Sequence, residues 1–195
     1  MHISEGILSG SVLIAGWAGT VTGVSVGLKK TNPDKIVRVA LLSSAFFLAS
    51  LVNVKVGPSS THLSLLAPMG LILGWAAFPA ILVALLLQAV LFHFGGLLVL
   101  GVNVFIMGFS SVSVYLLFGK KIRESGSKIY SFIAGAFAVI LAAFLAGLCL
   151  GLTDGNFLTA AKLIVAVHLP LSLIEGLATM FIISWLKRVS PEFIA

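Results

Sequence analysis

Residues 129–151 read IYSFIAGAFAVILAAFLAGLCLG, a run that contains no charged side chain. An apolar stretch of about 18 residues or more is typical of a transmembrane helix. Backbone polar groups inside a bilayer must also pair within their own segment, which favours helices. This run therefore indicates that the chain crosses a membrane.

The composition of the whole chain agrees with this interpretation. Of 195 residues, 59% are hydrophobic and 9% are charged, whereas about a quarter of the residues in a soluble domain are charged. The net charge of +6 comes from basic residues in short clusters between apolar runs. Such clusters set the orientation of membrane helices, so they do not indicate nucleic-acid binding. Cys149 is the only cysteine, which excludes an internal disulfide.

Hydropathy and helix-breaking residues predict an all-α integral membrane protein with about seven transmembrane helices. The third helix is short and is bracketed by Gly57-Pro58 and Pro79, so we expect it to be tilted, broken or partly re-entrant. No linker interrupts the pattern, and we expect residues 1–195 to form one transmembrane domain. The predicted helices cover residues 6–28, 36–54, 62–76, 79–100, 101–118, 129–151 and 160–186.

Lysine and arginine mark one side of the predicted bundle. Basic clusters follow the first, fifth and seventh helices, which end on the same side if seven helices alternate, and only Lys55 and Lys162 fall on the other side. Because basic loops stay in the cytoplasm, we expect the N-terminus outside and the C-terminus in the cytoplasm. The clusters are Lys29, Lys30, Lys35 and Arg38; Lys120, Lys121, Arg123 and Lys128; and Lys187 and Arg188.

Met1 and His2 can offer three nitrogen atoms to one metal ion: the α-amine, the amide nitrogen of residue 2 and an imidazole nitrogen. A planar, nitrogen-rich set suits Ni(II) or Cu(II), and Co(II) is less demanding. The chelate needs a free Met1 amine, and the bulky His2 should favour retention of Met1. Alternatively, His2 is a chance residue at a frayed terminus.

His62 is our candidate for a fourth nitrogen ligand. It follows a turn at Gly57-Pro58, and Ser59, Ser60 or Thr61 can cap the next helix. His62 would then project from the first turn of that helix toward the outside. The alternative is a histidine that only makes hydrogen bonds at the membrane interface.

Four motifs stand out along the chain: MHISEG (1–6), VGPSSTHL (56–63), GWAAFPAILVALLLQAVLFHFGGLLVLGVNVFIMG (74–108) and HLPLSLIEG (168–176). Together they resemble the CbiM/NikM family, the substrate-binding components of energy-coupling factor transporters for cobalt and nickel. The resemblance implies seven helices, an outer N-terminus and a location in the inner membrane of a bacterial or archaeal cell. It also implies a metal held by the amine of Met1, the amide and imidazole nitrogens of His2 and the imidazole of His62.

The resemblance further implies partner proteins: a transmembrane coupling subunit, ATPase subunits and often a small accessory membrane subunit. Many relatives have Gly-Thr-Ser-Gly-His where this chain has Pro58-Ser59-Ser60-Thr61-His62. This departure leaves the choice between nickel and cobalt open. We favour nickel, because Ni(II) generally binds nitrogen ligands more strongly than Co(II).

Other polar residues are candidates to support the metal ligands. His168 and Glu175 are seven residues apart on one predicted helix and so share a face. Ionisable residues are costly inside a membrane and usually face the bundle interior, where these two could orient a ligand or make structural hydrogen bonds. Further candidates are Glu5, Asn53, Ser59 and Ser60, whereas we expect Gln88, His93 and Asn103 to tie helices together.

Gly19, Gly23 and Gly27 form a stripe of small residues on the first predicted helix. Such a stripe lets another helix approach closely. We expect it to serve packing within the bundle, and contact with a separate membrane partner is the alternative.

The motif Gly-x-x-x-x-Gly-Lys-Ser/Thr is absent, so this chain cannot supply a P-loop for ATP hydrolysis and we do not expect it to be an enzyme. We expect the metal-capturing subunit of an ATP-driven importer. The alternative is an ion-coupled carrier that works without an ATPase, but Glu175 is the only carboxylate well inside a predicted helix. A metallopeptidase is disfavoured because His-Glu-x-x-His is missing.

Overall fold

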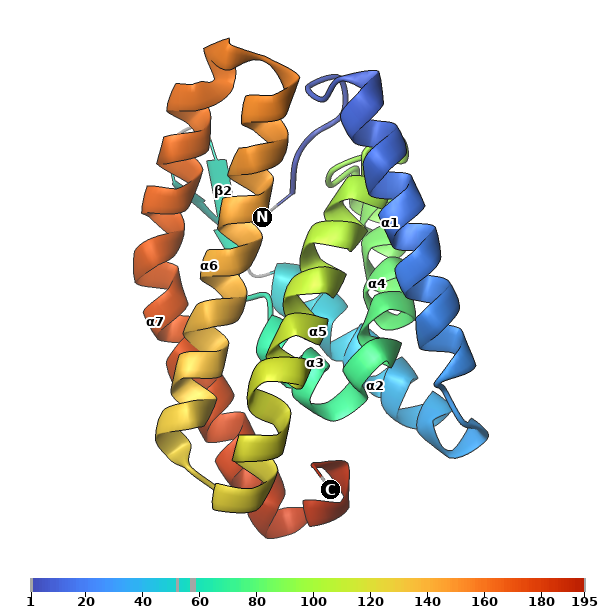
Figure 1. The fold of residues 1–195 in the computed structure, drawn as a ribbon, viewed down its shortest axis with the longest axis vertical. Helices are drawn as coiled ribbons and strands as arrows, with labels where there is room; N and C mark the ends of the chain where they lie inside the picture. Colours follow the sequence, from blue (N-terminus) through green and yellow to red (C-terminus); the bar gives the residue numbers. More distant parts are fainter. Residues whose placement is uncertain (1, 52, 57–58, 195) are drawn as a thin grey trace.

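The computed structural model describes residues 2–51, 53–56 and 59–194, and in this part the chain is a bundle of α-helices with one short β-hairpin (Figure 1). The predicted all-α membrane fold is therefore confirmed in outline. The helices are α1 (Gly10–Lys29), α2 (Pro33–Leu51), α3 (Leu66–Leu73), α4 (Ala77–Phe92), α5 (Leu100–Ser125), α6 (Lys128–Thr153) and α7 (Leu158–Val189), and the strands are β1 (Asn53–Val56) and β2 (Ser59–His62). Short 3-10 turns are η1 (Gly74–Ala76), η2 (Gly155–Phe157) and η3 (Pro191–Phe193).

Within the described residues, five helical ranges are long and apolar enough to cross a membrane: Gly10–Lys29, Leu66–Phe92, Leu100–Ser125, Lys128–Thr153 and Gly155–Val189. The sequence predicted about seven. The difference has two sources, because α3 and α4 count together as one range and α2 begins with the charged residues Asp34, Lys35 and Arg38.

The third helix differs from the prediction of 62–76. The hairpin of β1 and β2 pairs Asn53 with His62, so His62 ends a strand and does not lie in the first turn of a helix. The predicted helix cap by Ser59, Ser60 or Thr61 is wrong for the same reason. The β-branched residues Val54, Val56 and Thr61 favour an extended backbone in this segment. The helix α3 begins only at Leu66.

The fourth helix also ends earlier than the predicted residue 100. It stops at Phe92, and His93 follows in the left-handed conformation with φ +55°. Gly95 and Gly96 then take φ values of +78° and +137°. Because glycine alone adopts such values without strain, these two residues force a loop before α5. His93 is exposed in that loop and does not tie helices together.

α5 lies at the centre of the bundle and contacts α1, α3, α4 and α6, while α6 and α7 pack against each other along their length. The glycine stripe of α1 packs against other helices of the same chain. A Cβ atom at Gly23 would lie 2.5 Å from the Phe78 ring, and one at Gly27 would lie 2.6 Å from Pro79. The outer faces carry exposed apolar side chains such as Leu169, Leu173 and Phe181 on α7, as expected for contact with lipid.

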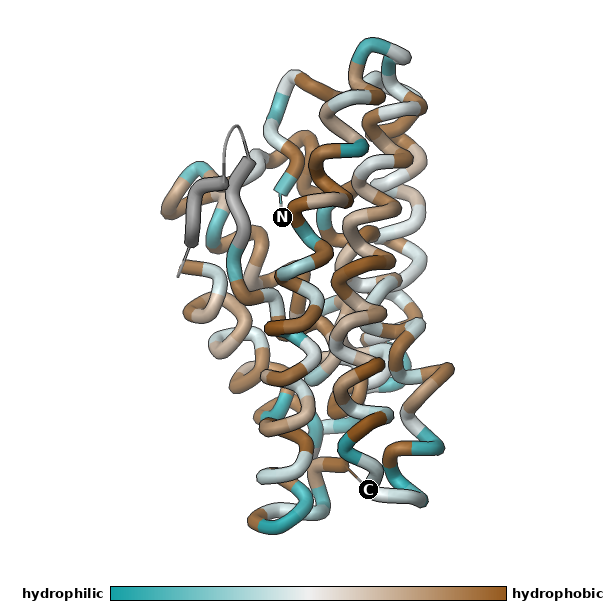
Figure 2. The backbone as a smooth tube through the Cα atoms, turned by 90° about the vertical axis from the view of Figure 1, so that its left-hand side faces the viewer, coloured by the Kyte–Doolittle hydropathy of each residue, from teal (hydrophilic) through white to brown (hydrophobic). Residues whose placement is uncertain are grey.

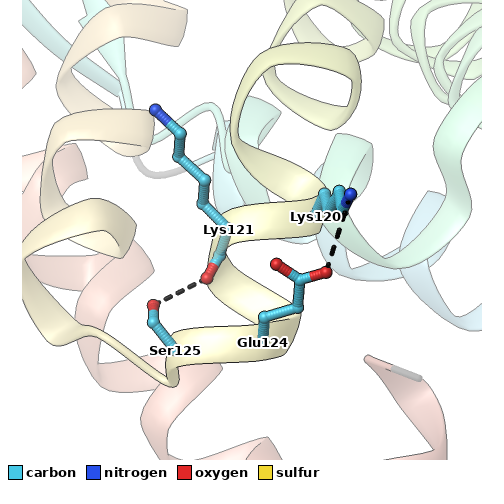
Figure 3. Close-up of polar contacts among 4 residues, drawn as sticks. All are labelled: Lys120, Lys121, Glu124 and Ser125. Carbon is cyan, nitrogen blue, oxygen red and sulfur yellow. Dashed lines mark hydrogen bonds and ion pairs between the residues drawn. The ribbon is translucent and has the colours of Figure 1, made fainter.

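The basic clusters gather at one end of the bundle, together with the C-terminus (Figures 1 and 2). Arg38 of α2 lies 4.5 Å from the Phe193 ring, and Lys187 of α7 donates a hydrogen bond to the carbonyl of Ile122. Figure 3 shows the end of α5 in this region, where Lys120 and Glu124 form an exposed ion pair at 3.9 Å. Basic residues far apart in sequence therefore share one surface.

Candidate metal centre

The segment before α1 runs into the bundle (Figure 1) and is held there by backbone hydrogen bonds. The side chain of Asn103 on α5 accepts a bond from the Ile3 amide at 3.1 Å and donates one to the Ile3 carbonyl at 3.1 Å. Ile3 is buried, and the amide of Glu5 donates to the carbonyl of Gly95 at 3.1 Å. Residue 2 is thus fixed inside the bundle and is not at a frayed end.

The loop between α4 and α5 is shaped to receive this segment. A Cβ atom at Gly95 would lie 3.1 Å from the Asn103 amide and 3.8 Å from the His2 ring, and one at Gly96 would overlap the Glu5 side chain. The Glu5 carboxylate accepts a hydrogen bond from the Leu98 amide at 2.8 Å. Glu5 was predicted from the sequence, whereas neither glycine was, although adjacent glycines after an apolar helix indicate a loop.

His2 and His62 lie side by side despite a separation of sixty positions in the sequence. Their ring centroids are 5.0 Å apart, with an angle of 33° between the ring planes. Burial lowers the pKa of His62 to about 3, and burial also holds the pKa of His2 well below its ordinary value. Both imidazoles are consequently neutral at pH 7, which is the form that binds metal ions.

The hydrogen bonds of His62 leave one nitrogen free. Its Nδ1 atom lies 3.1 Å from the carbonyl oxygen of Leu63, which can only accept, so Nδ1 carries the proton. The Nε2 atom then keeps its lone pair, and it is buried without a hydrogen-bond partner among the residues that the structure describes. A backbone carbonyl on the far nitrogen is the usual way to orient a metal-binding histidine.

Glu175 of α7 fixes the backbone that follows His62. Its carboxylate accepts hydrogen bonds from the Ser64 amide, from the Ser64 hydroxyl at 2.7 Å and from the Leu65 amide at 3.2 Å. Leu65 has φ +49°, an unfavourable value for leucine. Glu175 therefore holds a strained turn that connects the hairpin to α3. Ser64 was not anticipated from the sequence.

Gln88 of α4 also belongs to this neighbourhood. Its amide nitrogen donates to the Ser50 hydroxyl of α2, as expected for a residue that ties helices together. The Oε1 atom of Gln88 and the Nε2 atom of His2 are both buried, and neither has a hydrogen-bond partner among the described residues. Gln88 raises the pKa of His2, but burial lowers that pKa by more. Gln88 is thus placed to accept a hydrogen bond from His2.

Not every candidate residue predicted from the sequence lies beside His2 and His62. Met1 lies outside the described residues, and only the backbone of Asn53, Ser59 and Ser60 is described. Asn103 holds the N-terminal segment and does not connect helices through side chains. Over the described residues, no three His, Cys, Asp or Glu side chains converge closely enough to hold a metal ion. A centre at His2 and His62 would therefore need ligands beyond the described His, Cys, Asp and Glu side chains.

These features define a helical membrane protein whose N-terminal segment enters the bundle and places the neutral imidazole of His2 beside that of His62. The chain matches the family model "CbiM: Cobalt uptake substrate-specific transmembrane region" over residues 2–193, and it belongs to this family.

Several relatives and solved structures are similar over nearly the whole chain. A candidate metal transport protein of Haemophilus influenzae is 36% identical over 98% of this chain and 96% of its own length. The cobalt transport protein CbiM of a Nostoc species is 28% identical over 98% of this chain and 80% of its own length. A crystal structure of a truncated transition metal transporter has a TM-score of 0.85 at 26% identity, covering 96% of this chain and 99% of that one.

Proposed function

We propose that this protein captures Ni(II), or less strongly Co(II), from outside the cell as the substrate-specific subunit of an ATP-driven importer. The observation that carries the proposal is the contact of His2 with His62, with the unpartnered Nε2 atom of His62 beside the inserted N-terminal segment. Family membership supports transport, and the relatives are named for cobalt or for nickel.

The proposed ligands are the amine of Met1, the amide nitrogen and imidazole of His2, and Nε2 of His62. Amide nitrogen and imidazole Nδ1 of one histidine close a six-membered ring with the metal, so Nδ1 of His2 is the atom that fits the chelate. Nε2 of His2 is then left to donate to Oε1 of Gln88. Four nitrogens in a roughly square-planar set favour Ni(II). This composition also explains why no cluster of three side chains is needed.

The surroundings suit an ion that arrives from the N-terminal end of the bundle. A cavity of about 380 Å³ lies next to the inserted segment and is lined in part by Glu5, His93 and Leu97. We expect energy to come from separate ATPase subunits through a transmembrane coupling subunit, because this chain has no P-loop motif.

A four-residue Gly-Ser-Gly-Ser extension before Met1 tests the chelate. The extension turns the Met1 amine into an amide and moves the free amine too far from His2 to share a chelate with it. We expect the affinity for Ni(II), measured by equilibrium dialysis on purified protein, to fall at least about a hundredfold, equivalent to about 2.7 kcal/mol. The same four residues added after Ala195 are the matched control. Equal affinity of both proteins would show that the terminal amine is not a ligand.

Metal competition tests the selectivity. Purified protein with its native N-terminus is equilibrated with equal concentrations of Ni(II) and Co(II), and the bound metals are measured by mass spectrometry. We expect nickel to be retained in excess, because Ni(II) binds a given set of nitrogen ligands more strongly. Preferential retention of cobalt would contradict this assignment.

A further inference from the structure

His168 on α7 has a buried nitrogen that the proposed chelate does not use. The residue is 1% exposed, and its Nδ1 atom lies 2.8 Å from the carbonyl oxygen of Ile164. Because a carbonyl only accepts, Nδ1 carries the proton and Nε2 keeps its lone pair. That Nε2 atom is buried, and no described residue gives it a hydrogen bond.

His62 and His168 have the same hydrogen-bond arrangement. Each uses Nδ1 on a backbone carbonyl of its own segment, and each keeps a buried, unpartnered Nε2 atom. β2, which ends at His62, contacts α7, and His168 is among the groups that act on the charge of His62. The strand that ends at His62 therefore packs against the helix that carries His168, and each imidazole keeps a free lone pair on Nε2.

His168 nevertheless does not complete the outer centre. His2, His62 and His168 do not form a three-residue metal cluster among the described side chains. His62 lies next to His2, and the strand of His62 contacts the helix of His168, so His62 is the ligand that two ion positions can share.

Glu175 supports the second position through the backbone. Its side chain is 1% exposed. Its hydrogen bonds come from Ser64 and Leu65, the residues that follow His62 by two and three positions. Because Glu175 and His168 lie on the same helix, α7 both carries His168 and holds the backbone that follows His62.

We propose that His62 and His168 form an inner station for the transported divalent ion, in which their two Nε2 atoms hold it as it leaves the terminal chelate. The inference rests on the proposed function of the outer centre. In this step the ion exchanges the amine, the amide nitrogen and the imidazole of His2 for the imidazole of His168, and the amide nitrogen regains a proton from water. His62 remains bound throughout, so the ion is never fully released, and its charge does not change.

The inner station can be tested after the outer chelate is disabled by Gly-Ser-Gly-Ser added before Met1. Ni(II) is titrated into this purified extended protein, alone and with His168→Gln. We expect weak residual binding of one ion, reduced at least tenfold by His168→Gln and unchanged by Lys162→Gln, which alters an exposed residue on the same helix. His168→Cys should restore binding in part, because a thiolate is also a metal ligand, whereas a purely structural histidine would not be rescued in this way.

The outcomes separate the two proposals. The inner station would be overturned if the extended protein showed no residual binding, or if His168→Gln did not reduce that binding. Either result would leave the outer chelate intact. If the extension itself has no effect on affinity, the outer chelate fails instead. In the complete transporter we expect His168→Gln to slow nickel uptake at least tenfold and His168→Cys to recover part of it. Uptake by His168→Gln at the rate of Lys162→Gln would also overturn the inner station.

Discussion

At the scale of single residues, Asn103 fixes the position of the N-terminal segment. Its side-chain amide pairs with both backbone groups of Ile3 at 3.1 Å in a buried environment. Asn103→Leu would leave a buried amide and a buried carbonyl unpaired, at roughly 1–3 kcal/mol each. We expect the Ni(II) affinity to fall by more than about tenfold, measured by equilibrium dialysis. Asn156→Leu changes an exposed asparagine and should keep the wild-type affinity.

His62 makes stability depend on pH. The pKa of an unfolded histidine is about 6.5, whereas burial lowers the pKa of His62 to about 3 in the folded protein. The unfolded chain binds more protons between these values, so this contribution to stability is complete above about pH 6.5 and is lost as the pH falls toward 3. We expect the Tm of metal-free protein to fall from pH 7 to pH 5, and to fall less in His62→Gln. An identical slope in both proteins would contradict the assignment.

At the scale of elements, α7 and the turn before α3 are joined through Glu175. Glu175→Gln keeps the size of the side chain but turns one oxygen into a donor that faces the donors of Ser64 and Leu65. Hydrogen bonds to charged groups contribute roughly 1.5–3 kcal/mol, so we expect the Ni(II) affinity to drop about tenfold as His62 loses its fixed position. Glu124→Gln alters an exposed carboxylate at the other end and should have no effect. A wild-type affinity for Glu175→Gln would remove this link between α7 and the metal centre.

The same elements show what the sequence can predict. The apolar runs of α1, α5, α6 and α7 are decided by local hydropathy, and their positions were predicted to within several residues at most ends. The hairpin before α3 was missed, because its pairing is set by residues on either side of a turn and not by hydropathy. The contact of His2 with His62 followed from family resemblance. The hydrogen bonds between Asn103 and Ile3 join residues one hundred positions apart in the sequence, and no local sequence pattern predicts them.

At the scale of the whole molecule, the bundle has two chemically different ends. The inserted N-terminal segment lies at one end, where the Ser9 amide donates to the Thr153 hydroxyl near the end of α6. The basic clusters lie at the other end with the C-terminus, where Lys187 bonds to the Ile122 carbonyl. Since basic segments stay in the cytoplasm, we infer that the N-terminal end faces outward. With this orientation, the proposed metal centre would be accessible to an ion arriving from outside the cell.

Cysteine labelling tests this orientation. Cys149 is the only cysteine, so Cys149→Ala gives a background into which Asn156→Cys and Ser125→Cys are placed, both at exposed positions at opposite ends of the bundle. We expect a membrane-impermeant maleimide to label Asn156→Cys in intact cells and to label Ser125→Cys only after the membrane is opened. The reverse pattern would place the histidines at the cytoplasmic surface. An importer could not then capture its ion at this centre, and the proposed direction of transport would have to be abandoned.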